Sequence, residues 1–538
     1  MFSRLTMTGK VLVAIVFAVL VGGAFYLWGP KGNGKVEGST STSTTTTETT
    51  KSSGNWLTNL FSGKSADLTI GLNTWSGFAP PVWYNDGKDV NKESKFYKEF
   101  GLKLQINQMD DRKVCIESLL ADQVDAIYTT TDISSAEMGD EGQLAKAGVV
   151  QFFKVDDSRG ADVIVATRNF NSVSDLKKTT KIACAFPTAS STLLINWLDA
   201  GGKTIKDVTI IYVESGAKAA ELFKAGQVDL AVVWSPDDGD CIKAVQGSHV
   251  ATSTKYATSI IMDGMVAKKS VIESKAKYFD KLVRGWLSAN AAMQDAGNRD
   301  LAAAAFSKAF GFQLDLVKDG VSKVRFSTYG DNKAFFGLDP TYTGTTGSDL
   351  YTRMSRIYKA TESDKGGFYA KNPIPWVKAS YSGVIEGITD MTGGNNVVEA
   401  DIKFAPSTAA DLAKPSMATR MVSINFATNQ FLLDNDAKTI IDREVGPMAK
   451  SWKGAKIRIE GNTDNTGVYK NNKSLSLARA KSVMDYLMKT YGFDKNKFEI
   501  VGNGPDKPAN GSTDIKEANA TESLKTANRR TDFGLIAE

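Results

Sequence analysis

The spacing of hydrophobic and polar positions changes several times along this chain and divides it into segments. Residues 11–29, VLVAIVFAVLVGGAFYLWG, form an unbroken apolar run, whereas residues 38–53, GSTSTSTTTTETTKSS, are almost entirely polar. From Asp67, short Val- and Ile-rich runs alternate with stretches of helical spacing, beginning with DLTIGLNTW, NKESKFYKEFG and LKLQINQM. Strands that alternate with helices predict βαβ units in a parallel or mixed sheet.

The alternation starts again further along the chain. TKIACAFPTAS precedes the helical stretch STLLINWLDAGG, and VTIIYVES precedes AKAAELFKAGQ and then VDLAVVWSPDD. We therefore expect two α/β lobes.

A third unit begins at about Met417, after a connection rich in Pro, Ser and Ala over residues 401–416. MVSINFATNQ and KIRIEGNTD have the alternation of strands, SLSLARAKSVMDYLMKTYG is a helix that stops at Gly492, and FEIVGNG and NRRTDFGLI are further strands. This order predicts a C-terminal α+β domain, residues 417–538, with helices on one face of a sheet.

The apolar run near the N-terminus is long enough to cross a bilayer as a helix and carries no charge. We expect a cytoplasmic leader at residues 1–10, a transmembrane anchor at residues 11–29 and a Ser/Thr-rich linker at residues 30–64. A cleaved signal peptide is the alternative, although no Ala-x-Ala site follows the run. A retained anchor predicts a single-pass protein of the inner membrane, with the bulk of the chain in the periplasm.

Composition excludes several classes of function. The 538 residues suit about three domains, and 65 Lys and Arg against 60 Asp and Glu give a net charge of only +5, which argues against nucleic-acid binding. Cys115, Cys184 and Cys241 lack the spacing of a zinc site, and a lone histidine, His249, excludes multi-histidine metal sites. Without a nucleophile beside a base or a Gly-rich phosphate loop, we predict a binding protein with no catalytic activity, metal or cofactor.

Ligands of open α/β sheets bind beyond the carboxyl ends of the strands, close to helix N-termini. Polar and aromatic residues follow several predicted strands, and a strand-end Trp exposes a large ring unless something covers it. Helix capping alone also explains Ser, Thr and Asp at such places. The predicted solute-binding residues are Trp75, Phe78, Thr130, Asp132, Ser158, Ser190, Ser191, Glu214, Trp234 and Asp237.

The charge of the solute stays open at this point. A helix that begins near Ser190 and Ser191 suits a sulfonate, nitrate or carboxylate. Acidic residues of the same loops repel an anion and attract an amine, unless they are simply solvated: Asp132, Asp157, Asp162, Glu214, Asp237 and Asp238.

Four stretches, LNTWSGFAPPVW, ADQVDAIYTTTD, FPTASSTLLINWL and AGQVDLAVVWSPDDGD, together resemble the periplasmic solute-binding proteins of the nitrate, sulfonate and taurine ABC transporters. The resemblance runs from about Asp67 to Asp390. It implies a two-lobed clamp over residues 65–400, with lobe 1 formed by about 65–167 and 261–400 and lobe 2 by about 168–260. It also implies hinges near residues 160–167 and 260–267, and an ABC permease as partner.

The C-terminal stretches INFATNQFLL, IEGNTDNTG, NKSLSLARAKSV, VGNG and ANRRTDFGL resemble the OmpA C-terminal-like peptidoglycan-binding domain. The resemblance implies that Asp464 and Arg479 bind the ammonium and carboxylate of diaminopimelate in the stem peptide. It places Thr463, Asn472, Leu475 and Arg529 around that pocket. This family commonly has His where this chain has Asn462. A direct bridge between Asp464 and Arg479 is the alternative.

The sequence as a whole predicts an α/β two-lobed clamp, a C-terminal OmpA-like domain and an N-terminal transmembrane helix. The expected function is capture of a small solute, for ABC-type uptake, by a protein that also binds peptidoglycan. An envelope-tethering scaffold or sensor with a degenerate cleft is the alternative. An enzyme like the pyrimidine-synthesising relatives of these clamps is disfavoured, because His249 is alone.

Overall fold

The computed structural model describes residues 65–360, 372–400, 402–424, 426 and 430–538. The expected leader, anchor and Ser/Thr-rich linker lie outside the described residues. Within the described ranges, no helix combines the length and apolarity needed to cross a membrane.

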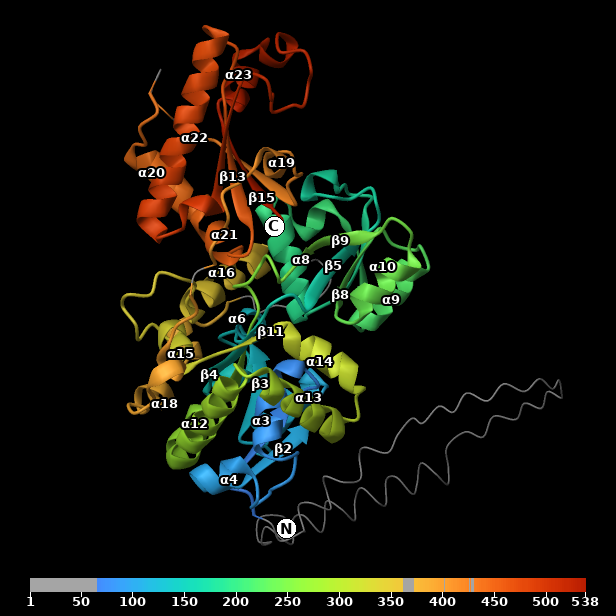
Figure 1. Cartoon of the computed structure of the whole chain (residues 1–538), viewed down its shortest axis with the longest axis vertical. Coiled ribbons are helices and arrows are strands. Elements are labelled where there is room, and N and C mark those ends of the chain that lie inside the picture. The colour runs from blue at the N-terminus through green and yellow to red at the C-terminus, as the bar shows by residue number, and fades with distance from the viewer. Residues whose placement is uncertain (1–64, 361–371, 401, 425, 427–429) are drawn as a thin grey trace, which may run out of the picture. The chain divides into compact units, whose positions relative to one another are not determined.

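Lobe 1 is built on a mixed six-stranded sheet in the order β11-β4-β10-β3-β1-β2. β1 pairs in parallel with β2 and β3, whereas β10 runs antiparallel to β3 and β4. The strands are β1 (Leu68–Leu72), β2 (Leu104–Gln108), β3 (Ala126–Thr130), β4 (Val149–Ser158), β10 (Met262–Lys268) and β11 (Val324–Phe326). The predicted alternation of strands and helices is present here (Figure 1).

Helices cover this sheet, and their ends follow local sequence signals. Ser94 caps α4 through its side chain, and Gly101, with φ of 60°, ends the same helix in the left-handed conformation that glycine adopts most easily. The lobe 1 helices are α3 (Ala79–Tyr84), α4 (Lys95–Phe100), α5 (Arg112–Leu120), α6 (Thr131–Glu137), α7 (Gln143–Lys146), α11 (Lys269–Ser274), α12 (Ala276–Ala292), α13 (Ala296–Phe310), α14 (Leu314–Ser322), α15 (Tyr329–Phe335), α16 (Gly347–Ala360), α17 (Trp376–Ala379) and α18 (Gly383–Glu386).

Lobe 2 has a five-stranded sheet in the order β7-β6-β8-β5-β9. Its elements are β5 (Asp162–Ala166), β6 (Lys181–Ala185), α8 (Ala189–Ala200), β7 (Thr209–Val213), α9 (Gly216–Lys224), β8 (Leu230–Trp234), α10 (Asp237–Ala244) and β9 (His249–Ser253). Ile164 and Ala166 pack with α8, whereas Val163 and Val165 pack with α9 and α10, so the strands are apolar on both faces (Figure 1).

The boundary between the lobes differs from the predicted one. β5 pairs with β8 and β9, so residues 162–166 belong to the sheet of lobe 2 rather than to lobe 1. The first crossover therefore precedes Asp162. Sequence placed a hinge near residues 160–167 but ended lobe 1 at about residue 167, because nothing local distinguishes β5 from the end of the long strand β4.

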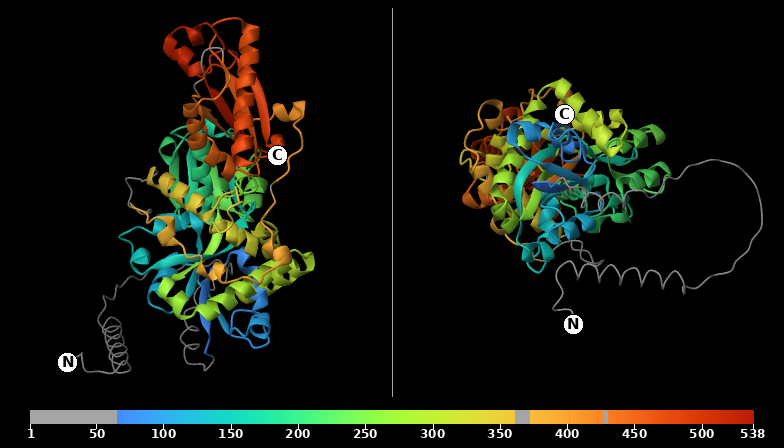
Figure 2. Two further views of the ribbon diagram at one scale, coloured as in Figure 1. Left: turned by 90° about the vertical axis from the view of Figure 1, so that its left-hand side faces the viewer. Right: turned by 90° about the horizontal axis from the view of Figure 1, so that it is seen from below.

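The C-terminal domain carries helices on one face of the sheet β12-β15-β13-β14. Its elements are α19 (Ala409–Leu412), β12 (Ala418–Val422), α20 (Asn435–Glu444), α21 (Gly446–Ser451), β13 (Lys456–Asn462), α22 (Tyr469–Tyr491), β14 (Phe498–Gly504), α23 (Glu522–Asn528) and β15 (Thr531–Ile536). As predicted, the long helix α22 ends at Gly492, where φ is 71°. This helix runs alongside the sheet of the C-terminal domain, which is coloured orange to red in Figure 2.

The other face of this sheet is covered by the connection that precedes it. Arg458 donates hydrogen bonds of 2.9 Å to the Asp411 and Lys414 carbonyls, and it forms a 2.8 Å ion pair with Glu499. Lys456 donates to the Ala405 carbonyl at 2.7 Å. Residues predicted as a linker therefore include a segment packed on the domain.

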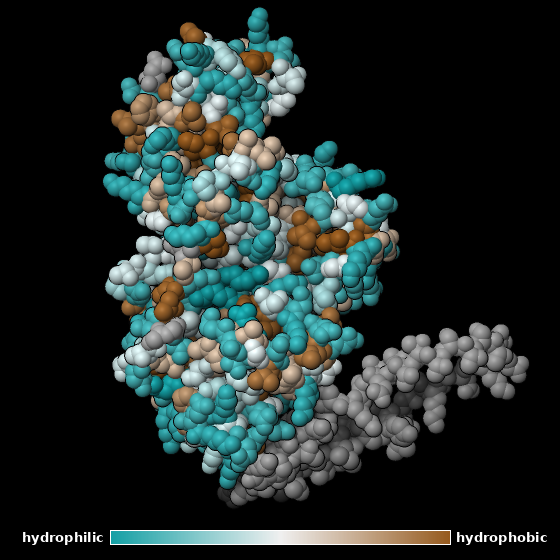
Figure 3. All heavy atoms as spheres, viewed as in Figure 1, coloured by the Kyte–Doolittle hydropathy of each residue, from teal (hydrophilic) through white to brown (hydrophobic). Residues whose placement is uncertain are grey.

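Helix α8 of lobe 2 also contacts the C-terminal domain. The fully buried Trp197 donates from its indole nitrogen to the Met417 carbonyl at 3.0 Å, and Arg420 donates to the Asp199 carbonyl at 2.6 Å. On the face seen in Figure 3, hydrophilic side chains predominate and apolar ones form separate groups.

Candidate functional site

The expected cleft lies at the junction between the lobes, and a hydrogen bond crosses this junction at the first turns of two helices. Asp132 stands in the first turn of α6 in lobe 1, and Thr192 stands in the first turn of α8 in lobe 2. The Thr192 hydroxyl donates to Asp132 Oδ2 at 2.5 Å, and neither side chain is exposed. The chain's own carboxylate thus lies where α8 begins.

A second carboxylate, Asp162, occupies the same end of α8. Ser158 donates to Asp162 Oδ2 at 2.8 Å, and Ser190 donates to Asp162 Oδ1. The predicted residues Ser158 and Ser190 therefore meet on Asp162, at the same end of α8 as the bond between Asp132 and Thr192.

Asp156 and Asp263 face each other across neighbouring strands. They are register partners of β4 and β10, and their carboxyl groups are within hydrogen-bonding reach. The half-buried Trp75 places its indole nitrogen 3.4 Å from Asp156 Oδ1, and Thr130 is the register partner of Asp263 on the other side.

Asp132, Asp156, Asp162 and Asp263 form an acidic group. Burial is the main influence on the pKa values of these four carboxyl groups. Among the residues that the structure describes, none of the four forms an ion pair with Lys, Arg or His. Burial raises the pKa of Asp132 and of Asp156 to about 7. Burial and the neighbouring Asp156 raise the pKa of Asp263 well above its ordinary value.

The structure separates several other predicted residues from this group. Phe78 is fully buried against Tyr128 and Trp286 in the core of lobe 1, because the short turn after Trp75 directs its ring inward. Ser191 is also fully buried and forms a capping box with Thr188.

Three predicted residues lie at strand ends of lobe 2. Trp234, half-buried at the end of β8, lies directly over Gly216, where an added Cβ would come within 2.6 Å of the ring. Glu214 follows β7 and is exposed, and Asp237 begins α10. Nearby, Lys323 of lobe 1 donates to the Ser235 hydroxyl of lobe 2, which is a second contact across the cleft.

Asp156, Asp263 and Lys323 were missed by the sequence reasoning. Asp263 had a usable signal, because it is the single acid in the apolar stretch SIIMDGMVA. Asp156 stood beside Asp157 in FFKVDD, and the sequence does not reveal which of the two acids faces the cleft.

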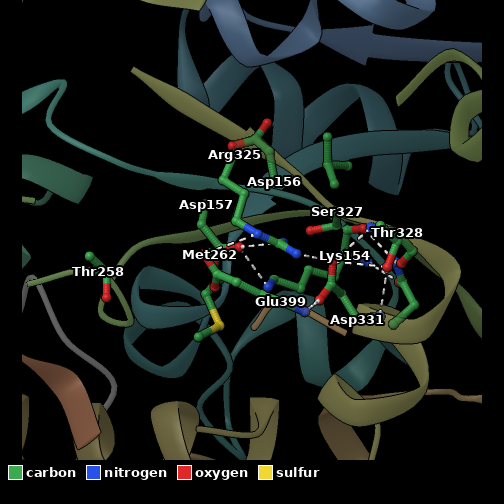
Figure 4. A network of polar contacts seen from close by, with 12 residues as sticks. Lys154, Asp156, Asp157, Thr258, Met262, Arg325, Ser327, Thr328, Asp331 and Glu399 are labelled. Carbon is green, nitrogen blue, oxygen red and sulfur yellow. Dashed lines mark hydrogen bonds and ion pairs between the residues drawn. The ribbon is translucent and has the colours of Figure 1, made fainter. Parts of the chain in front are cut away.

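Asp157 belongs instead to a balanced network of charges (Figure 4). Lys154 pairs with Asp157 at 2.8 Å, and Arg325 pairs with Asp331 at 2.7 Å. Arg159 bonds to Glu399 at 2.8 Å. Although burial acts to raise the pKa of Asp157, the charges of Lys154, Arg159 and Arg325 outweigh it and lower that pKa. This network holds the segment around Glu399 against the crossover between the lobes.

The second candidate site is in the C-terminal domain, between the end of β13 and the first turns of α22. Arg529 forms a 2.6 Å ion pair with Asp464, and the Thr466 amide donates to the other Asp464 oxygen at 2.8 Å. Burial acts to raise the pKa of Asp464, but these hydrogen bonds outweigh it, so the pKa is lowered and the carboxylate is charged.

Arg479 lies close enough to Asp464 to feel its charge, but its direct contacts are with other residues. Its Nε donates to the Gln430 carbonyl at 3.0 Å, and its guanidinium lies 4.8 Å from the centre of the Phe426 ring. Among described residues, no carboxylate forms an ion pair with Arg479. The direct bridge to Asp464 that sequence left open is therefore absent from this part of the structure, although the Asp464 charge acts on Arg479.

Neighbouring residues shape the loop that holds Asp464. Asn472 donates to the Thr466 carbonyl at 3.0 Å, and Thr463 donates from its hydroxyl to the Asp464 carbonyl at 2.8 Å. Leu475 is half-buried on α22. Asn462 is buried and bonds to Asp532 at 3.1 Å, so its amide is engaged below the loop.

Two family profiles match the chain. The NMT1-like family matches residues 62–307, and the OmpA family matches residues 425–522. Both resemblances expected from sequence are thus confirmed.

Curated relatives match only the C-terminal part. Outer membrane protein Omp38 of Acinetobacter baumannii is 39% identical over 83 residues, which are 15% of this chain and 23% of that protein. Outer membrane porin F of Pseudomonas aeruginosa is 29% identical over 96 residues, or 18% of this chain and 25% of the porin. The chain therefore spans about a quarter of the length of these relatives.

Solved structures are similar to more than half of this chain. The periplasmic aliphatic sulphonate binding protein SsuA from Escherichia coli has 16% identity and a TM-score of 0.46, and the match covers 64% of this chain and 98% of SsuA. The periplasmic nitrate-binding protein NrtA from Synechocystis PCC 6803 has 13% identity and a TM-score of 0.37, with 59% and 91% covered.

Proposed function

Since the chain joins an NMT1-like domain, residues 62–307, to an OmpA-family domain, residues 425–522, we propose that it is a solute-binding protein of the periplasm that also docks to the cell wall. The two lobes capture a small solute, and the C-terminal domain binds peptidoglycan. The apolar run at residues 11–29 anchors the protein in the inner membrane. An ABC permease receives the solute.

The arrangement of Asp464 and Arg479 carries the wall-binding part of the proposal. Asp464 is held charged, and the guanidinium of Arg479 has no carboxylate partner among the described residues. A carboxylate beside an unpaired guanidinium suits a ligand that has both an ammonium and a carboxylate, because each group gains a charge-assisted hydrogen bond. The diaminopimelate of the stem peptide has both groups.

The contacts that cross the cleft support solute capture by closure of the lobes. Thr192 of lobe 2 bonds to Asp132 of lobe 1, and Lys323 of lobe 1 bonds to Ser235 of lobe 2. Both contacts are side-chain hydrogen bonds between the lobes, so opening of the proposed clamp would break them. The proposed solute enters the open state and is enclosed as these contacts form.

An envelope scaffold or sensor with a degenerate cleft is the second candidate. One observation favours it: Asp132 and Asp162 already occupy the hydroxyl donors at the N-terminus of α8. In this alternative the wall-binding domain supplies the whole function.

Sedimentation with purified sacculi tests the wall-binding part. We expect Arg479→Ala to remove most of the co-sedimentation of the full-length protein. Lys481→Ala is the matched control, because Lys481 is a basic residue of the same helix whose partner, Asp485, also lies on its surface. Equal co-sedimentation of wild type and Arg479→Ala would refute the assignment of the pocket.

A further inference from the structure

We infer that the cleft takes an organic cation, a solute with a primary ammonium group, and that Asp132, Asp156 and Asp263 bind it. This inference rests on the proposed function, in which the lobes close on a solute. It goes further by choosing the chemical class of that solute.

The first step concerns the N-terminus of α8, the place where an anion would be expected. Its hydroxyl donors, Ser190 and Thr192, are engaged by Asp162 and Asp132. A sulfonate or nitrate at this end of the helix would have to displace these carboxylates and then lie beside them in a buried site. Two like charges at such a short distance repel each other strongly when water is excluded.

The second step concerns oxygens that have no donor. Asp132 Oδ1 and Asp156 Oδ2 are buried and accept no hydrogen bond from any described residue. The Gln151 side-chain oxygen, on strand β4 of the same sheet, is also buried without a partner among the described residues. Burying such groups unpaired costs free energy, which a donor from the solute would recover.

The third step concerns the number of donors that the group can use. The carboxyl of Asp263 is beside that of Asp156, and the two repel each other when both are ionised. An ammonium group brings three N–H donors and a positive charge. It therefore bonds to both carboxylates of the pair at once.

Trp75 adds an aromatic surface beside the carboxylates. Its indole nitrogen points to Asp156 Oδ1, and a Cβ added at Gly77 would lie 2.2 Å from Asp156 Oδ2 and 2.3 Å from the indole nitrogen. Glycine at position 77 thus allows backbone, indole and carboxylate to approach closely. Tryptophan faces attract organic cations through the charge distribution of the ring.

The geometry favours an organic cation over a metal ion. Within the described residues, no three His, Cys, Asp or Glu side chains converge closely enough to hold a metal. The acidic group is instead spread over β4, β10, α6 and β5, which suits a ligand larger than a single ion.

Ligand-induced thermal stabilisation of the full-length protein tests the inference. The probes are putrescine and ethanolamine as amines, and nitrate and methanesulfonate as anions, each titrated at pH 8. We expect an amine to raise the melting temperature with increasing concentration and the anions to have no effect. In Asp156→Asn and in Asp132→Asn, the amine should bind at least tenfold more weakly.

Glu141→Gln is the matched control, because it removes one negative charge from the exposed surface of lobe 1. It should respond as wild type does. If the Asp variants do not fold, Trp75→Phe, which keeps a ring but removes the indole N–H, should weaken binding severalfold.

The outcomes separate this inference from the proposed function. Stabilisation by nitrate or methanesulfonate, with the amines inactive, would overturn the cation inference and leave solute capture standing. An equal response to amines in wild type and Asp156→Asn would overturn it as well. Silence of all four probes would overturn the inference and favour the scaffold.

Discussion

Asp464 in the C-terminal domain and Asp156 in the cleft are both largely buried carboxylates, but their surroundings are opposite. Asp464 has an ion pair with Arg529 and a backbone donor, and its pKa is lowered. Asp156 has the weak contact with Trp75 and another carboxyl beside it, and burial raises its pKa to about 7. The site around Asp464 keeps its carboxylate charged, whereas the site around Asp156 contains buried acids that lack a counter-charge.

The difference suits the two kinds of binding that we propose for this chain. In the proposed wall-binding site, Arg529 already fixes the carboxylate of Asp464, so the stem peptide binds there with little rearrangement. A cleft that buries uncompensated acids is less stable empty than filled, so its ligand contributes to closure. The predictions below test this contrast, from the largest expected effect to the smallest.

Removing the carboxylate of Asp464 should have the largest effect on ligand binding. We expect Asp464→Ala to weaken binding of a diaminopimelate-containing muropeptide by on the order of 100-fold, because truncating one partner of a hydrogen-bonded charge pair costs about 3 kcal/mol. Isothermal titration measures the change. A loss of less than threefold would show that Asp464 does not touch the ligand.

Removing an acid of the cleft should instead stabilise the empty protein. Because the folded state raises the pKa of Asp156 from 3.8 to about 7, this residue favours folding at low pH, and that contribution is lost as the pH rises from about 4 to about 7. Above pH 7, Asp156→Asn should increase the free energy of unfolding by on the order of 2 kcal/mol. At pH 4 it should give no increase.

Denaturant unfolding at the two pH values measures this difference. The groups that act on the pKa of Asp156 are Asp157, Asp263, Lys154 and Trp75. Lys154 is 2.8 Å from Asp157 and is committed to that partner, so it does not neutralise Asp156. A variant that is less stable than wild type at both pH values would contradict the assignment of an uncompensated acid.

Arg529 should have an intermediate effect on wall binding. It holds Asp464 but is itself partly exposed and also bonds to Glu522 at 2.6 Å. We expect Arg529→Gln to weaken muropeptide binding about fivefold, or roughly 1 kcal/mol, because the ligand's ammonium still finds the carboxylate. A loss as large as that of Asp464→Ala would mean that Arg529 itself contacts the ligand.

The contact between Lys323 and Ser235 should have the smallest effect. Lys323 also pairs with Asp319 at 2.9 Å, and its side chain is partly exposed. We expect Lys323→Ala to change the free energy of unfolding by less than about 0.5 kcal/mol. It should nevertheless increase hydrogen exchange around Ser235 and α14, because one of the contacts across the cleft is lost. Unchanged exchange there would show that this contact does not hold the lobes together.

Sequence predicted the parts of this protein that depend on local signals. The alternation of strands and helices in both lobes and the end of α22 at Gly492 are present in the structure. The motifs around Asp464 were sufficient for the family assignment of the C-terminal domain, because they are spaced closely along the chain.

The cleft was harder to predict because its partners come from distant parts of the chain. Asp156 meets Asp263 only through the register of β4 and β10, and Asp132 meets Thr192 only because the lobes are in contact. Phe78 shows the converse. It follows a strand end, as a ligand-contacting residue would, but a single turn directs its ring into the core beside Trp286.

The measurement that tests the central claim most directly is a paired titration of the full-length protein with a diaminopimelate-containing muropeptide and with putrescine. It compares wild type, Asp464→Ala and Asp156→Asn. If the two sites are independent, Asp464→Ala should lose binding of the muropeptide only, and Asp156→Asn should lose binding of the amine only. Loss of both ligands in either folded variant, or of neither in both, would contradict the claim.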